Sequence, residues 1–155
     1  MPAGRARRAD FIGHRIETMA FEGQENHAVA LGAFLERDQY AKLLGIRFGD
    51  VGAGRASATM IVRPDMVNGH GLCHGGAIFS LADAVFGAAS NSHGRKALAQ
   101  FCTIAFLRPA SEGDELTAVG QETAASGLRG VFDINVSCGD ELIAAFRGHV
   151  RVIEE

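Results

Sequence analysis

The sequence predicts an α+β domain in which one antiparallel sheet wraps around a single buried helix. The first observation is the segment 75–91, whose apolar residues follow helical spacing and whose one charged residue is Asp83. The second is a train of four strand-like segments joined by short turns, at residues 97–107, 115–123, 129–138 and 142–153. Sequential strands with short connections favour antiparallel pairing, so we expect a four-strand meander. A helix that is apolar nearly all round must be covered by a face of that sheet.

The N-terminal part is organised differently. Residues 1–26 are polar and lack clear periodicity, so we expect a flexible tail followed by a single domain over residues 27–155. Within 27–44 the apolar residues recur at helical spacing, and Gly45 is expected to end that helix. One or two strands should follow, because residues 55–63 alternate between small apolar and polar side chains up to Pro64.

Composition and charge exclude several classes of partner. The chain has 155 residues, 47% of them hydrophobic, and a formal net charge of −3. It therefore has no overall basic field that would attract nucleic acid or an anionic membrane. No apolar run approaches the ~18 residues needed to span a bilayer. The three cysteines are an odd number with apolar or strand-like neighbours, which disfavours a disulfide framework and predicts a cytoplasmic location.

The charged residue of the predicted central helix is the first candidate for chemistry. Burying Asp83 is costly, so its carboxylate needs a partner, a water-filled site or a catalytic role. In the structural alternative Asp83 is bonded to Ser80 or to a facing backbone group. Gly75 and Gly76 at the helix start leave backbone N–H groups that suit an oxyanion, and glycine lets a substrate carbonyl come close. Alternatively, these glycines only ease the turn and the packing.

The separation of these residues has a consequence for assembly. Asp83 lies eight residues after Gly75, which is about 12 Å along a helix axis. Reacting groups must converge within about 3–3.5 Å. If both residues act on one bond they must come from two chains, so the sequence predicts a homodimer with shared active sites.

The segment from Asn68 to Asp83 reads Asn-Gly-His-x-x-Cys-His-Gly-Gly-x-x-Phe-Ser-Leu-Ala-Asp. It resembles the hotdog thioesterases of the phenylacetate-degradation protein family, as do Phe106–Pro109 and Ala145–Gly148. The resemblance runs from about Leu35 to Val152. It implies a hotdog fold, a homotetramer built from dimers, and hydrolysis of an acyl-CoA substrate. An aryl-acetyl acyl group, as in phenylacetyl-CoA or hydroxyphenylacetyl-CoA, is implied by the resemblance alone.

The same resemblance implies roles for individual residues. Asp83 would be the nucleophile or the general base, and Gly75 would supply the oxyanion N–H, with Gly76 beside it at the substrate. His74 and Asn68 would orient the thioester or the attacking water.

The phosphates of CoA would meet cations and hydroxyls at strand ends. We expect Arg108, Ser126 and Arg129 to contact them, although each is also explained as an ordinary solvated or turn residue. No cofactor is expected.

Other activities remain open. Three residues, His70, Cys73 and His74, invite a metal site, but such sites need three or four converging ligands and no second cluster follows, so no metal is expected. A non-catalytic acyl-CoA-binding hotdog protein and an acyl-CoA hydratase or dehydratase are the alternatives to a thioesterase. Release of free CoA would distinguish the thioesterase from both.

Overall fold

The computed structural model describes residues 22–153, with side chains from residue 30 onward. Its elements in chain order are α1 (Glu22–Arg37), α2 (Gln39–Leu44), β1 (Arg47–Gly52), β2 (Arg55–Ile61), the short 3-10 helix η1 (Pro64–Met66), α3 (Gly75–Asn91), β3 (Ala97–Phe106), β4 (Glu115–Ser126), β5 (Arg129–Cys138) and β6 (Glu141–Val152). The tail expected for residues 1–26 lies, up to residue 21, outside the described residues. Residues 22–26 form the first turns of α1.

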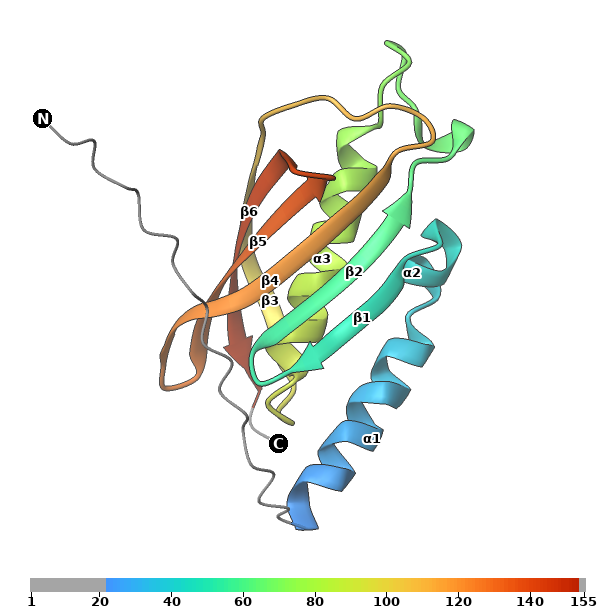
Figure 1. Ribbon diagram of the computed structural model, residues 1–155. Coiled ribbons are helices and arrows are strands. Elements are labelled where there is room, and N and C mark those ends of the chain that lie inside the picture. The colour runs from blue at the N-terminus through green and yellow to red at the C-terminus, as the bar shows by residue number, and fades with distance from the viewer. Residues whose placement is uncertain (1–21, 154–155) are drawn as a thin grey trace, which may run out of the picture.

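α3 is the central helix of the fold, and it begins at Gly75 as the sequence predicts. The sheet wraps around it, and α3 contacts all six strands (Figure 1). The side chain of Phe86 is almost completely buried, and its ring lies near those of Phe132 and Phe146, with centroids 5.8 and 5.5 Å apart. Gly148 makes this approach possible, because a Cβ there would lie 2.5 Å from the Phe86 ring. The predicted antiparallel sheet around one buried helix is confirmed.

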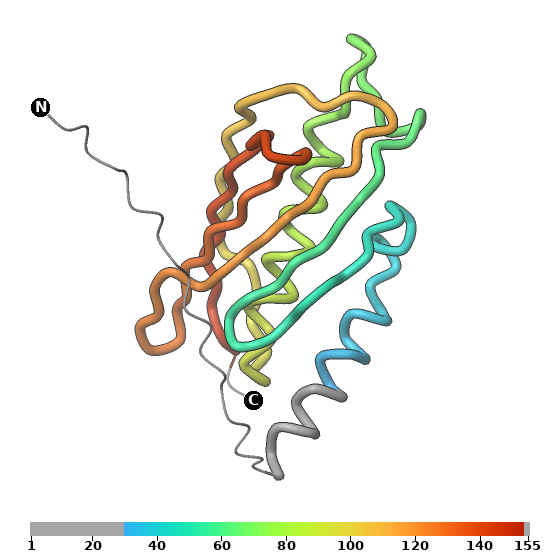
Figure 2. Tube along the Cα trace, in the orientation of Figure 1, coloured from blue at the N-terminus to red at the C-terminus, as the bar shows by residue number. Residues whose placement is uncertain are grey.

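The order of the strands corrects one prediction. The sheet has six antiparallel strands in the order β1-β2-β4-β5-β6-β3. β4, β5 and β6 form a meander, but β3 pairs with β6 and not with β4, so the four-strand meander is wrong for β3. The reason is the connection at residues 107–114, which is too long for a tight hairpin. It crosses the N-terminal end of α3 before entering β4 (Figure 2).

The segment before the central helix holds two strands. β2 follows the predicted alternation, with Ala56, Ala58 and Met60 buried. β1 pairs with β2 through a register shift between Phe48 and Val51. Glycines inside β1 interrupt its alternation, which explains why the sequence leaves open whether one strand or two precede the helix.

The single helix predicted for residues 27–44 is divided into α1 and α2, which corrects the prediction. Asp38 stands between them with an extended backbone, and its side chain accepts a hydrogen bond from Ala41 N at 2.9 Å. An aspartate that caps the following helix in this way starts a new helix instead of continuing the old one. Gly45 ends α2 with a φ of 70°, as expected.

Two further observations bear on the sequence predictions. None of the described helices is long and apolar enough to cross a membrane. Cys73, Cys102 and Cys138 are free thiols.

Candidate active site

The first turn of α3 is organised by His74. His74 is the N-cap residue, and its Nδ1 accepts a hydrogen bond from Gly76 N at 2.9 Å. Its backbone carbonyl accepts from Ala77 N at 2.9 Å and from Ile78 N at 3.3 Å. Within residues 22–153, no acceptor is found for the N–H of Gly75. One donor at the positive end of the helix is therefore left for another group.

The backbone N–H groups of Gly76 and Gly75 differ in their hydrogen bonding. Its N–H is already bonded to the His74 ring, and a Cβ on Gly76 would lie 3.0 Å from His74 Nδ1. The absence of a side chain at Gly76 therefore lets the imidazole close over the helix end. In this conformation Gly76 contributes room at the helix start, whereas Gly75 contributes the N–H donor.

Asn68 shapes the loop that leads into the helix. Its Oδ1 accepts hydrogen bonds from His70 N at 2.8 Å and from Leu72 N at 3.2 Å. The side-chain NH₂ of Asn68 has no acceptor among the described residues. Asn68, Gly75 and Arg108 line one cavity of about 380 Å³. The structure thus brings together three residues that the sequence analysis selects separately.

Phe106 borders this cavity and was not selected from the sequence. A Cβ on Gly75 would lie 3.1 Å from Cζ of the Phe106 ring. The ring packs directly over the first turn of α3, although about half of the side chain is exposed. Local patterning of the sequence does not single out Phe106, because the approach of β3 to α3 depends on the tertiary fold.

Asp83 lies on the exposed side of α3, two turns beyond Gly75. Its carboxylate accepts no hydrogen bond within residues 22–153. The proposed bond to Ser80 is not formed, because the Ser80 hydroxyl donates to the Gly76 carbonyl at 2.7 Å. The structural alternative for Asp83 therefore lacks the partner it would need.

The surroundings of Asp83 disfavour its negative charge. Burial beside apolar walls raises the pKa of the Asp83 carboxyl, and the charge of Asp38 raises this pKa further. Asp83 borders a cavity of about 460 Å³ with Leu31, Phe34 and Phe86. Cys102 lies close enough for the Asp83 charge to contribute to the raised pKa of its thiol. Within residues 22–153 the carboxylate has no hydrogen-bond partner, and it borders a cavity while the residue keeps an exposed side. This is an environment that suits a general base or a nucleophile.

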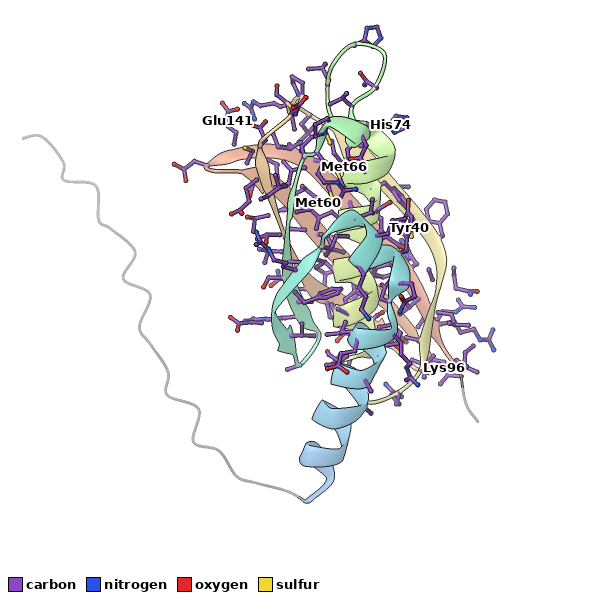
Figure 3. The ribbon with its side chains drawn as sticks, turned by 90° about the vertical axis from the view of Figure 1, so that its right-hand side faces the viewer. Tyr40, Met60, Met66, His74, Lys96 and Glu141 are labelled. Atoms are coloured by element: carbon purple, nitrogen blue, oxygen red, sulfur yellow. The ribbon has the colours of Figure 1, made fainter. Side chains whose placement is uncertain are left out.

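The two cavities do not meet within one chain. No residue lines both the cavity at Gly75 and the cavity at Asp83. Figure 3 shows the separation, with His74 at the N-terminal end of α3 and Lys96, which borders the Asp83 cavity, toward the other end. The structure therefore brings Asn68, His74 and Gly75 together and leaves Asp83 apart from them.

The residues predicted to bind CoA phosphates fall in two places. Arg108 borders the Gly75 cavity, and its Nη1 donates to the Leu142 carbonyl at 3.3 Å. Ser126 and Arg129 face each other across β4 and β5 and line a hollow of about 430 Å³. Arg151 lines the same hollow directly opposite Arg129, a position that no local sequence pattern indicates.

The pairing of β5 with β6 places two cations next to each other at this hollow. Further along the same two strands, Asp133 stands opposite Arg147, and the two side chains form a bidentate ion pair at 2.6 Å. At Arg129 and Arg151 the opposed residues carry the same charge, which is unfavourable in a sheet, and both side chains are exposed. His149 also lines this hollow.

No metal centre accompanies these residues. Within residues 22–153 no group of three or more His, Cys, Asp or Glu side chains is placed to hold a metal ion. His70 is exposed at the tip of the Asn68 loop, and Cys73 is buried. The side chains that suggested a metal site therefore do not converge.

Comparisons with known proteins identify the family and the fold. The model of the thioesterase superfamily matches residues 70–145, which include both Gly75 and Asp83. A curated relative, the acyl-coenzyme A thioesterase PaaI of Escherichia coli K12, is 47% identical over 117 residues, which are 75% of this chain and 84% of the relative. The solved structure of the E. coli PaaI protein from the phenylacetic acid degradation operon covers 84% of this chain and 96% of its own at 42% identity, with a TM-score of 0.80.

A second solved structure, the TT0310 protein of Thermus thermophilus, covers 76% of this chain and 99% of its own at 32% identity, with a TM-score of 0.74. These likenesses extend over most of the described chain and confirm the hotdog fold expected from the segment between Asn68 and Asp83. The chain belongs to the thioesterase superfamily.

Proposed function

We propose that this chain is an acyl-CoA thioesterase that acts on aryl-acetyl-CoA or a related acyl-CoA and releases the free acid and CoA. The observation that carries the proposal is Asp83, a carboxylate that has no hydrogen-bond partner among residues 22–153, has a raised pKa and borders a largely apolar cavity. It stands on the same helix as Gly75, whose N–H has no acceptor among the described residues. Similarity to an acyl-coenzyme A thioesterase at 47% identity supports the choice of thioester.

The proposed reaction uses the two groups on opposite sides of one carbonyl. The thioester oxygen accepts a hydrogen bond from Gly75 N–H, which stabilises the negative charge that develops on that oxygen. Asp83 either takes a proton from the attacking water or attacks the carbonyl carbon itself. The carbon–sulfur bond then breaks and CoA leaves as the thiolate. In the first route the free acid is formed directly; in the second the acyl group is left on Asp83 as a mixed anhydride, which water hydrolyses to the free acid and the regenerated carboxylate. His74 holds the first turn in shape, and the NH₂ of Asn68 is available to orient the thioester or the water.

The proposed site is completed by a second chain. Gly75 and Asp83 are about 12 Å apart along one straight helix, too far for both to act on one carbonyl. The exposed side of α3 carries mainly small side chains, and the neighbouring edge strand β3 exposes Leu98, Phe101 and Phe106. An antiparallel pair of such helices would cover these surfaces and place each Asp83 near the partner's first helical turn. We propose this homodimer, and a tetramer of two such dimers.

CoA phosphates are assigned to the cationic positions. Arg129, Arg151 and Ser126 line one hollow, where the opposed arginines favour a bound anion. Arg108 lies at the other cavity and is the second candidate. We retain residues 27–155 as the proposed catalytic domain, and the free thiols favour a reducing cytoplasm as its location.

The test is release of CoA from acyl-CoA substrates. The protein is mixed with phenylacetyl-CoA, and free CoA is measured by chromatography because the chain's own three thiols would react with a colorimetric thiol reagent. A thioesterase releases CoA and acid in equal amounts. A hydratase would change an enoyl-CoA without releasing CoA, and a non-catalytic binding protein would retain the intact ligand. No CoA release from aromatic, short-chain or long-chain acyl-CoA would refute the proposed function.

A further inference from the structure

The cavity beside Asp83 is built from three segments, and we call it the Asp83 cavity. Its volume is about 460 Å³. One face of α1 forms a wall through Ala30, Leu31, Phe34 and Arg37; the C-terminal half of α3 and residues 94–99 form the rest. A cavity of about 150 Å³ is large enough for benzene. The Asp83 cavity therefore has room for an organic group larger than one aromatic ring.

Two polar side chains of this cavity, Asn91 and Ser90, already have hydrogen-bond partners within the protein. The side-chain amide of Asn91 donates to the Gly87 and Ala97 carbonyls at 3.0 and 3.2 Å and accepts from Ala97 N at 3.0 Å. The Ser90 hydroxyl donates to the Gly87 carbonyl at 3.2 Å. Apart from Asp83, these interior surfaces offer a ligand mainly hydrocarbon from Leu31, Phe34 and Phe86. The cavity suits an apolar group that is attached to the atom on which Asp83 acts.

Three cations also border the cavity, namely Arg37, Arg95 and Lys96. Each is exposed, so each can keep its charged group in water while its hydrocarbon stem lies against apolar surface. They do not require an anionic group on the ligand.

We propose that the acyl group of the substrate occupies the Asp83 cavity and that Phe34 and Leu31 of α1 set the size of acyl group that is accepted. The proposal rests on the proposed thioesterase function. The substrate class it names is an apolar acyl group, aryl or medium-chain aliphatic, with no polar group at its distal end. Selectivity then resides in α1, which lies outside the residues 70–145 that match the superfamily and contain Gly75 and Asp83.

Phe34 is the residue to change, because it faces the cavity and is 40% exposed in the described chain, so its truncation leaves the core intact. The experiment compares kcat/KM for phenylacetyl-CoA with that for naphthylacetyl-CoA, and kcat/KM for butanoyl-CoA with that for decanoyl-CoA. Phe34→Ala should raise kcat/KM for the larger substrate relative to kcat/KM for the smaller one by about tenfold or more. Small changes of fit in an apolar pocket change this discrimination by about 10–200-fold. Phe34→Trp should lower the ratio. Leu31→Ala is the second variant and should act like Phe34→Ala.

The matched control is Leu43→Ala on α2, which removes a large apolar side chain that is 67% exposed and does not line the cavity. It should leave both ratios unchanged. Thermal unfolding and size-exclusion chromatography accompany every variant, so that a loss of folding or assembly is recognised.

The outcomes separate this proposal from the proposed function. If the wild type releases CoA but neither Phe34 variant nor Leu31→Ala shifts the ratios beyond the Leu43 control, the acyl group lies elsewhere and the inference is overturned. A change of oligomeric state without a change of ratio also overturns it, since a second chain would then fill the cavity. If the wild type hydrolyses no acyl-CoA, the proposed function itself fails.

Discussion

The first turn of α3 and its middle turn present opposite kinds of chemistry. The first turn offers a backbone donor. The N–H of Gly76 donates to the His74 ring, whereas the N–H of Gly75 has no acceptor among the described residues. The middle turn offers a side-chain carboxylate, Asp83, without a partner in that same part of the chain and beside apolar walls. A donor for an oxyanion and a base for a nucleophile are complementary halves of one hydrolytic site. Because one helix holds them about 12 Å apart, the proposed homodimer is needed to bring the two groups to one carbonyl.

The largest effect is expected from removing the carboxylate at the middle turn. Asp83→Asn keeps the shape of the side chain but can neither accept a proton nor attack a carbonyl. We expect turnover of acyl-CoA to fall at least ~10²-fold while the protein remains folded. Steady-state CoA release and circular dichroism measure the two quantities. Near-normal turnover in the folded variant would remove Asp83 from the mechanism.

The donor at the first turn can be deleted without disturbing the helix. Gly75 is the first helical position, where proline is well tolerated, and His74 before it has the extended backbone that proline requires. Gly75→Pro removes the N–H and should reduce kcat by about 10²–10³-fold. Gly75→Ala is the control, because it crowds Phe106 in the same way but keeps the N–H. Equal losses in the two variants would show that crowding matters and the N–H does not.

Combining the two lesions tests whether the halves come from different chains. Gly75→Pro and Asp83→Asn should each be nearly inactive as homodimers. A mixed dimer has one site with both lesions and one site with neither, so it should recover up to about half the activity of the wild type. Co-expression with two different tags isolates the mixed dimer. Verified mixed dimers without recovery would place the whole site in one chain and would exclude Gly75 or Asp83 from it.

The smallest effect concerns stability. Burial and Asp38 raise the pKa of Asp83 in the folded chain, so folding favours its protonated form. The stability that this provides is complete below the ordinary aspartate pKa of about 3.9 and is lost as pH rises through the higher folded pKa. At neutral pH Asp83→Asn should therefore unfold at a higher temperature than the wild type.

The difference in unfolding temperature should disappear in acid, below the ordinary aspartate pKa. Asp50→Asn, which removes a carboxylate from an exposed residue of β1, is measured in parallel as the control. An Asp83→Asn protein that is less stable than the wild type at neutral pH would show that the carboxylate stabilises the fold. In that case the Asp83 carboxylate would have a structural partner in the folded protein.

The periodic elements were accessible from the sequence because burial leaves a local pattern. The boundaries of α3 and β5 follow from spacing and alternation alone. The position of β3 beside β6 was not accessible, because it depends on the path of residues 107–114 over the end of the helix. The separation of α1 from α2 at Asp38 depends on whether the Asp38 side chain caps the following turn. The spacing of apolar residues does not indicate whether this cap forms.

The candidate site was accessible to a similar degree. Asp83 stands out as a charge in an apolar helix, and Gly75 follows from the helix start. The opposition of Arg129 and Arg151 depends on the register of two strands, and the contribution of Phe34 depends on the placement of α1. Neither leaves a pattern in the chain itself, so both had to come from the structure.

The strand order has a consequence for how the chain is made. β6 is the last of the described strands in chain order, yet it lies inside the sheet between β5 and β3. During synthesis β3 leaves the ribosome before β6, the strand with which it pairs. Its backbone N–H and C=O groups therefore lack their final partners while β4 and β5 emerge. A nascent chain shortened before β6 has no means of joining β3 to the rest of the sheet. Completion of the fold is thereby coupled to completion of β6, which leaves little opportunity for a truncated product to become a stable, partly active protein.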